Sequence, residues 1–119
     1  MGFRIQRHSR LRNRTFFKKV YEQGRFLSNQ LITVHFFPHP GYPHRIGFTA
    51  GKRLGNAVVR NRCKRRMKEC YRLFREEIPE GFDMILVARK GIVEAEWSNV
   101  VAAFRDLLRR TRLVISKNG

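Results

Sequence analysis

The sequence is poor in acidic residues, and this shortage limits what the protein can bind. It has 9 Asp and Glu residues against 26 Lys and Arg residues, a formal net charge of +17. Such an excess of positive charge is typical of proteins that bind nucleic acid or an anionic membrane rather than a small substrate. The length of 119 residues suits a single domain, 1–119, with a modest core to which 10 Phe residues contribute.

Cysteine is also scarce, which bears on disulfides and metal sites. Cys63 and Cys70 are the only two, and on one helix their Cα atoms would lie roughly 10 Å apart at about 1.5 Å rise per residue. That separation is too long for a disulfide. Neither residue has the spacing to a histidine that a zinc site requires. We therefore expect both to be small core residues.

Long apolar runs are absent, so no segment approaches the roughly 20 residues of a membrane span. The first residues, MGFRIQRHSRLRNR, lack the apolar core and cleavage site of a signal peptide. We expect a cytoplasmic protein without a membrane partner. Residues 1–12 are expected to be a basic arm and residues 113–119 a frayed tail.

What the chain does have is a concentration of positive charge between residues 52 and 75, where Glu69 is the only acid. Wound as an α-helix at about 100° per residue, residues 60–75 present two faces. The core face carries Cys63, Met67, Cys70, Tyr71 and Phe74. The other face carries Arg60, Asn61, Lys64, Arg65, Lys68, Arg72 and Arg75.

A charged helix face is often only solvated, but such faces usually mix signs to gain favourable pairs. Here Lys64 and Lys68, and Lys68 and Arg72, are like-charged neighbours at i,i+4. This pattern indicates a helix that binds a polyanion.

An aromatic helix is predicted earlier in the chain, capped by Asn13 or Thr15 and ended by Gly24. Phe17 and Tyr21 are i,i+4 neighbours on it. Ordinary packing against a sheet would explain them. Stacking on unpaired bases in a groove would explain them equally well.

Two strands are expected next, LITVHFF at residues 31–37 and a second at residues 45–50, paired as a hairpin. Thr33, His35 and Phe37 would share one face of the first. The following loop, AGKRLGN, places Lys52 and Arg53 before Asn56, which is expected to cap the basic helix. It resembles a phosphate-binding loop but lacks the order of a P-loop.

The last third of the chain is expected to be structural. Residues 84–88 form a continuous apolar run that predicts a buried central strand. A helix is expected from Glu94, with Trp97 in the core, acids in its first turn and Arg109, Arg110 and Arg112 in its last. Four acids that follow the basic helix are expected on surface turns, Glu76, Glu77, Glu80 and Asp83.

Four histidines raise the alternative of a nuclease that uses imidazoles as general acid and base. They are His8, His35, His39 and His44. Their spacing fixes neither a metal site nor an acid and base pair. Only His35 is expected in a binding groove, and we expect no catalytic group in the chain.

The run GKRLGNAVVRNRCKRRMKE at residues 51–69 carries the signature of a known family. It resembles the signature segment of the protein subunit of bacterial ribonuclease P, an RN-x-x-KR-x-x-R helix after a K-[KR]-x-G-x-A-V loop. Arg60, Asn61, Lys64 and Arg65 match it, and Lys68 stands where the family has arginine. The aromatic helix, the strand LITVHFF and the segment ILVARK appear in the family's order, so the resemblance covers nearly the whole chain.

The resemblance implies a ribonucleoprotein that removes the 5′ leader from precursor tRNA. Its RNA subunit would hold the catalytic Mg²⁺ ions, and the protein would bind that ribonuclease P RNA and the precursor tRNA, not DNA. It also implies an α/β (α+β) sandwich of order αβββαβα with a left-handed βαβ crossover, against the usual right-handed rule.

Carried over by residue, the family's cleft for the leader falls on Phe17, Tyr21, His35, Lys52, Arg53, Arg60 and Lys90. The face for the catalytic RNA falls on Arg60, Asn61, Arg62, Lys64, Arg65 and Lys68. The alternative that stays open is a ribosomal or general RNA-binding protein, which would use the same charge and aromatic residues. A DNA-binding helix-turn-helix is disfavoured because no helix directly precedes the basic one.

Overall fold

The computed structural model describes residues 14–117, and its element order is the expected αβββαβα. The basic arm, with Asn13 and His8, lies outside the described residues. The helices and strands are α1 (Arg14–Gln23), β1 (Arg25–Ser28), β2 (Ile32–Pro38), β3 (Arg45–Thr49), α2 (Ala57–Leu73), β4 (Phe82–Ala88) and α3 (Trp97–Lys117). Three single 3₁₀ turns join them, η2 (Lys52–Leu54), η3 (Arg75–Glu77) and η4 (Lys90–Ile92).

The four strands form one sheet in the order β1-β2-β4-β3. β2 pairs with β1 and with β4 in antiparallel fashion, whereas β3 and β4 are parallel. The predicted hairpin between β2 and β3 is therefore wrong, because β4 lies between them. β4 is apolar apart from Asp83 and buried on both faces, and such a strand is most stable in the interior of a sheet. The hairpin partner of β2 is β1.

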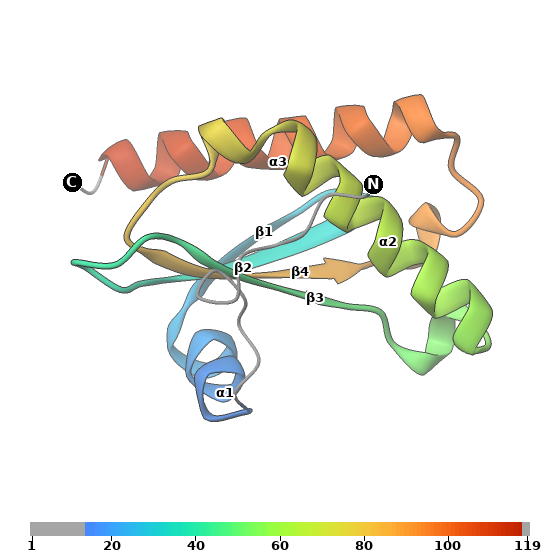
Figure 1. Ribbon diagram of the computed structural model, residues 1–119, viewed down its shortest axis with the longest axis horizontal. Coiled ribbons are helices and arrows are strands. Elements are labelled where there is room, and N and C mark those ends of the chain that lie inside the picture. The colour runs from blue at the N-terminus through green and yellow to red at the C-terminus, as the bar shows by residue number, and fades with distance from the viewer. Residues whose placement is uncertain (1–13, 118–119) are drawn as a thin grey trace.

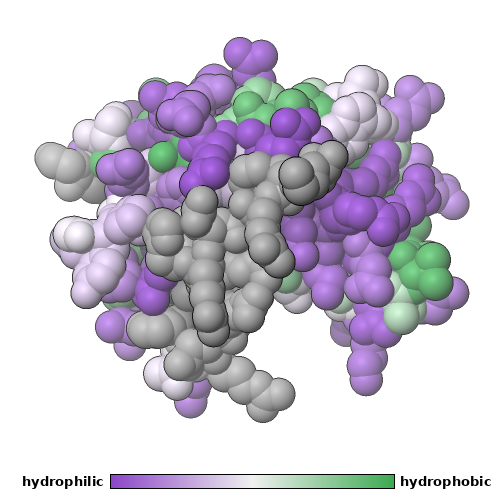
Figure 2. Space-filling model, in the orientation of Figure 1, coloured by the Kyte–Doolittle hydropathy of each residue, from purple (hydrophilic) through white to green (hydrophobic). Residues whose placement is uncertain are grey.

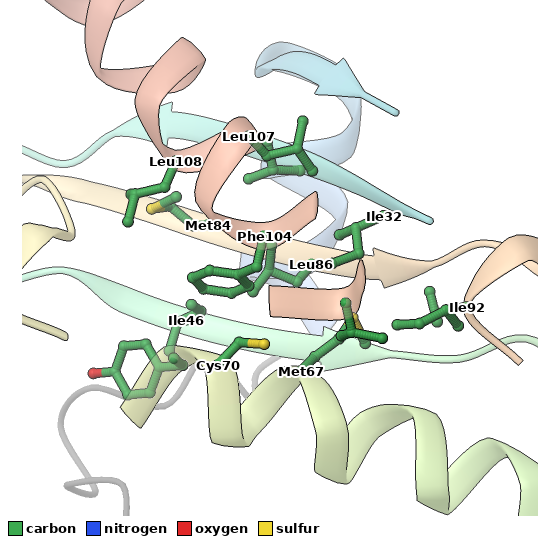
Figure 3. Close-up of a cluster of buried hydrophobic side chains, with 14 of the residues drawn as sticks. Ile32, Ile46, Met67, Cys70, Met84, Leu86, Ile92, Phe104, Leu107 and Leu108 are labelled. Atoms are coloured by element: carbon green, nitrogen blue, oxygen red, sulfur yellow. The ribbon is translucent and has the colours of Figure 1, made fainter. Parts of the chain in front are cut away.

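The sheet is the middle layer of a sandwich. Figure 1 shows α1 below the sheet and α2 and α3 above it. Figure 3 looks onto the sheet from the side of α2 and α3, where β4 lies above β3 and both strands run from left to right. The β3-α2-β4 connection is therefore left-handed, as the resemblance implied.

The main core lies between the sheet and the pair α2 and α3 (Figure 3). From α2 it receives the predicted stripe of Cys63, Met67, Cys70 and Tyr71, all buried. Both cysteines are free thiols. Burial raises the pKa of the Cys70 thiol to about 12. The expectation that both are core residues is confirmed.

A smaller core lies under α1. Val20 and Ile85 are buried there, with Phe17, Phe37 and Val87 packed around them. α1 ends at Gln23, and Gly24 follows as predicted. The backbone passes so close to β2 at Gly24 that a Cβ there would lie 2.6 Å from the Phe36 carbonyl oxygen.

α3 differs from the expectation at both ends. It begins at Trp97 rather than Glu94, so no acid lies in its first turn, and the indole of Trp97 is 40% exposed rather than in the core. It continues to Lys117, so residues 113–117 are helical, and Arg109, Arg110 and Arg112 lie before its last turn. Across residues 14–117, no helix combines the length and the apolar character needed to cross a membrane.

Candidate nucleic-acid interface

The predicted aromatic residues meet on one side of α1. The rings of Phe17 and Tyr21 stack with centroids 6.4 Å apart and planes 21° apart. Tyr21 meets His35 of β2 edge to face, with centroids 4.7 Å apart. Phe17 is anchored in the smaller core, whereas Tyr21 is 43% exposed. The three residues therefore form one continuous surface that joins α1 to the sheet.

This surface borders an open cleft of about 310 Å³, lined by Phe17, Tyr21, Phe48 and Thr49. Phe48 and Thr49 end β3 and were not predicted as site residues. The only signal for them was their place just before the basic loop at residues 51–55. The cleft thus has aromatic rings from α1 on one side and the end of the edge strand β3 on the other. The Phe48 ring itself packs into the main core, 6.1 Å from the ring of Tyr71, so Thr49 is the β3 side chain on the α1 face.

Phe26 was also missed. It lies directly opposite His35 in the pairing of β1 with β2, and the two ring centroids are 5.6 Å apart. Recognising it required β1 as a separate strand, whereas the sequence pattern predicted a strand only at residues 31–37. We call Phe17, Tyr21, His35 and Phe26 the aromatic row.

Burial shifts the two polar rings of the aromatic row toward their neutral forms. Partial desolvation lowers the pKa of the His35 imidazole below its ordinary value. The same cause raises the pKa of the Tyr21 hydroxyl. Near pH 7 both rings are therefore uncharged, and each offers a flat, neutral surface with one polar edge.

The predicted loop cations emerge at one end of the sheet. Because β3 and β4 are parallel, with Thr49 opposite Val87, the chain leaves both strands at the same end of the sheet. Lys52 and Arg53 follow β3 in η2, and Lys90 follows β4 in η4, and all three are exposed. Parallel pairing thus brings cations from two distant segments to the end of the sheet that carries Thr49.

The basic helix α2 forms as predicted. The Asn56 side chain accepts a hydrogen bond from the Val59 backbone N–H at 3.0 Å and caps the helix. Opposite the core stripe, Asn61, Arg62, Arg65 and Lys68 are exposed, while Arg60 and Lys64 are half-buried. Figure 2 shows the hydrophilic band that α2 contributes to this side of the molecule.

Two polar side chains of α2 are not simply exposed to solvent. Glu69 accepts a hydrogen bond from Arg72 Nε at 2.7 Å, and this bond lowers the pKa of the Glu69 carboxyl. The only acid of α2 is therefore engaged by its own helix. At the other end, Arg60 Nε is buried and forms no hydrogen bond within the described structure. Arg60 thus lies at the boundary between the core and the charged face.

The three histidines among residues 14–117 do not assemble an acid and base pair. His39 Nδ1 lies 3.3 Å from Asp83, but Arg45 holds that carboxylate through two bonds of 2.8 and 2.7 Å. Asp83 is buried, so its predicted place on a surface turn is wrong. His44 is buried and bonded to the Tyr71 hydroxyl at 2.6 Å.

Metal ligands do not gather in this part of the chain either. Among residues 14–117, no three His, Cys, Asp or Glu side chains lie close enough together to hold a metal ion. The described residues therefore do not fit a Mg²⁺ site.

Comparisons with known proteins agree with this geometry. The family model described as Ribonuclease P matches residues 5–112. The ribonuclease P protein component of Alkaliphilus oremlandii is 35% identical over 108 residues, which is 91% of this chain and 95% of that protein. The corresponding protein of Desulfovibrio desulfuricans is 40% identical over 110 residues, 89% of this chain and 85% of that protein.

Solved structures show the same fold. The RNase P protein from Thermotoga maritima superposes with a TM-score of 0.78 at 30% identity, covering 85% of this chain and 96% of that one. The RNase P protein from Staphylococcus aureus gives 0.79 at 25% identity, covering 87% and 94%. A cationic helix, an aromatic cleft and a matching sequence over most of its length together place the chain in the ribonuclease P protein family.

Proposed function

We propose that this chain is the protein subunit of a ribonuclease P ribonucleoprotein, which removes the 5′ leader from precursor tRNA in the cytoplasm. In this assignment the RNA subunit carries out the cleavage and holds the Mg²⁺ ions. The protein binds two RNAs at once, through two chemically different surfaces. It is thus a subunit of an endoribonuclease that contributes binding and no catalytic group.

The observation that carries the proposal is the separation of aromatic and cationic side chains onto different elements. Unpaired bases need faces on which to stack, and the surface that borders the cleft beside α1 offers Phe17, Tyr21 and His35. A folded RNA presents mainly phosphates, and α2 offers the exposed side chains of Arg62, Arg65 and Lys68. The first surface suits the single-stranded leader and the second suits the catalytic RNA.

The remaining cations have a place in the same scheme. Lys52, Arg53 and Lys90 gather where the chain leaves β3 and β4, near the Thr49 wall of the cleft, and would bind leader phosphates. Arg60, at the boundary of α2, would contribute to both surfaces. Screening of repulsion between two polyanions by these residues would lower the Mg²⁺ concentration that the ribonucleoprotein requires.

Reconstitution tests the proposal. The purified protein is added to a bacterial ribonuclease P RNA at a Mg²⁺ concentration too low for the RNA alone, and the cleavage site in a precursor tRNA is mapped. Restored cleavage at the leader junction supports the assignment. No restoration, despite tight binding of both RNAs, would indicate a general RNA-binding protein. Cleavage by the protein without added RNA would overturn it.

A further inference from the structure

Phe26 is the most exposed aromatic side chain of the aromatic row. Its relative exposure is 64%, the largest among the exposed Phe, Tyr and Trp residues of the described chain. It lies on β1, which pairs with β2 alone and forms an edge of the sheet. Its ring is tilted by 34° to that of His35. One face of the Phe26 ring is therefore accessible beside the ring of His35, which in turn contacts Tyr21 at the wall of the cleft.

Single exposed apolar residues are common on protein surfaces and need no ligand to explain them. Phe26 differs from such residues because its ring continues an unbroken series of ring contacts. Each ring of the aromatic row contacts the next, from Phe17 through Tyr21 and His35 to Phe26. Tyr42 is nearly as exposed, at 59%, but it stacks on His39, which is not part of the row.

The cleft and the aromatic row together cross the sheet from β3 at one edge to β1 at the other. At one end the cleft is walled by Thr49 of β3, next to Phe17, and at the other end stands Phe26 of β1. Between these two edge strands lie β4 and β2. Three strand spacings of about 4.8 Å give a path of roughly 14 Å. A single-stranded RNA can place successive bases along such a path.

We propose that Phe26, together with His35, is an additional base-stacking position that binds one unpaired nucleotide of the leader at the β1 end of the cleft. The inference rests on the proposed function, because it takes the leader as the occupant of the cleft. The neutral His35 ring supports it, since a flat uncharged ring beside Phe26 completes a platform that every base can use.

The first test measures the affinity of the reconstituted holoenzyme for precursor tRNA and for mature tRNA. Phe26→Ala is expected to weaken precursor binding at least about fivefold, the lower limit for loss of one stacked base, and to leave mature tRNA binding unchanged. Phe26→Tyr keeps the ring and should retain affinity. Tyr42→Ala removes an equally exposed aromatic outside the row and should change neither affinity.

The second test locates the base. Leaders carrying a single abasic nucleotide at successive positions are bound to the wild-type holoenzyme and to the Phe26→Ala and Phe17→Ala holoenzymes. At one position the abasic change should weaken wild-type binding yet add nothing to the Phe26→Ala defect. A different position should couple to Phe17 in the same way. A structural defect in the protein would not depend on one base.

The outcomes separate the inference from the function on which it rests. If Phe17→Ala weakens precursor binding and Phe26→Ala does not, the Phe26 position is wrong and the leader cleft stands. If the Phe26→Ala defect adds to every abasic change, Phe26 does not stack on a leader base. If neither variant discriminates precursor from mature tRNA, the proposed leader cleft itself fails.

Discussion

The guanidinium of Arg66 donates a hydrogen bond to the backbone carbonyl oxygen of Ala95 at 2.7 Å, which ties the cationic helix α2 to the segment leading into α3. A second bond from Arg66 reaches the Ile92 carbonyl oxygen at 3.1 Å. The segment held in this way begins with η4, which carries Lys90. Arg66 therefore uses its charge inside the protein, unlike its neighbours Arg62 and Arg65.

Replacing Arg66 with methionine should destabilise the free protein by about 1–3 kcal/mol, because two partly buried carbonyl groups lose their donor. Urea unfolding measures this change. Arg62→Met on the exposed side of the same helix is the matched control and should stay within about 0.5 kcal/mol of wild type. Equal losses in the two variants would contradict the assigned difference between them.

Removing the Phe17 ring should weaken binding of precursor tRNA but not of mature tRNA, because only the precursor has a leader. Phe17 also packs in the smaller core, so Phe17→Ala is best accompanied by Phe17→Leu, which keeps apolar volume and loses the aromatic face. Both should reduce precursor affinity roughly fivefold or more. Equal losses for precursor and mature tRNA would argue against a leader contact.

Replacing Arg60, Lys64 and Arg65 together with glutamine should weaken binding to the ribonuclease P RNA. It should also flatten the dependence of that binding on salt, by roughly one unit of slope for each phosphate that the variant no longer neutralises. A filter-binding titration at several salt concentrations measures both effects. The matched control removes three arginines from α3, Arg105, Arg109 and Arg112. If net charge alone mattered, the two triple variants would behave alike.

Gly24→Ala should destabilise the protein by about 1–3 kcal/mol, because the new Cβ would lie 2.3 Å from the Val20 carbonyl oxygen and 2.6 Å from that of Phe36. Both obstacles are backbone and cannot rotate away. Gly51→Ala is the control, since nothing lies within 4 Å of its Cβ position. Thermal unfolding that ranks Gly51→Ala below Gly24→Ala would contradict this packing argument.

Stability should fall on acidification partly through His35. Burial lowers the pKa of its imidazole in the folded protein, while the unfolded chain keeps the ordinary value of 6.5. Between the two values the unfolded chain binds more protons, so its population grows as pH falls. The contribution of His35 to the free energy of unfolding is fully present above pH 6.5, the pKa of His35 in the unfolded chain. It is lost as the pH falls toward the lower pKa of His35 in the folded protein.

His35→Phe removes the titrating group and keeps a ring in the aromatic row. Urea unfolding at about pH 7.5, 6 and 5, which spans the ordinary histidine pKa, should show a shallower decline for this variant than for wild type. The other histidines are present in both proteins and serve as an internal control. Identical pH dependence would show that folding does not lower the pKa of His35.

Features that depend on one helix were predictable from the sequence. The two faces of α2 follow from its period of about 3.6 residues, and Asn56 as its cap follows from residue type and position. Phe17 and Tyr21 were correctly paired because they lie one turn apart. Their contact with His35 could only be inferred through the family resemblance, since it joins a helix to a strand.

Features that depend on distant segments were missed or wrong. The hairpin of β2 with β3 failed because β4, which comes much later in the chain, inserts between them, and adjacency in sequence carries no information about such insertion. Asp83 is polar and follows other acids in the sequence, so it was predicted on the surface. Its burial requires Arg45 from β3 as a partner. Phe26 could be identified as a candidate site residue only from its position opposite His35 in the sheet.

The burial of both cysteines has a practical consequence. With its pKa at about 12, the Cys70 thiol has almost no thiolate at neutral pH, and both sulfurs are shielded by the core between α2 and the sheet. The folded wild-type protein is therefore expected not to react with maleimides at its cysteines. A cysteine introduced at exposed Lys90 or Lys52 would react alone, so a photocrosslinker or dye can be attached beside the cleft without first removing either natural cysteine.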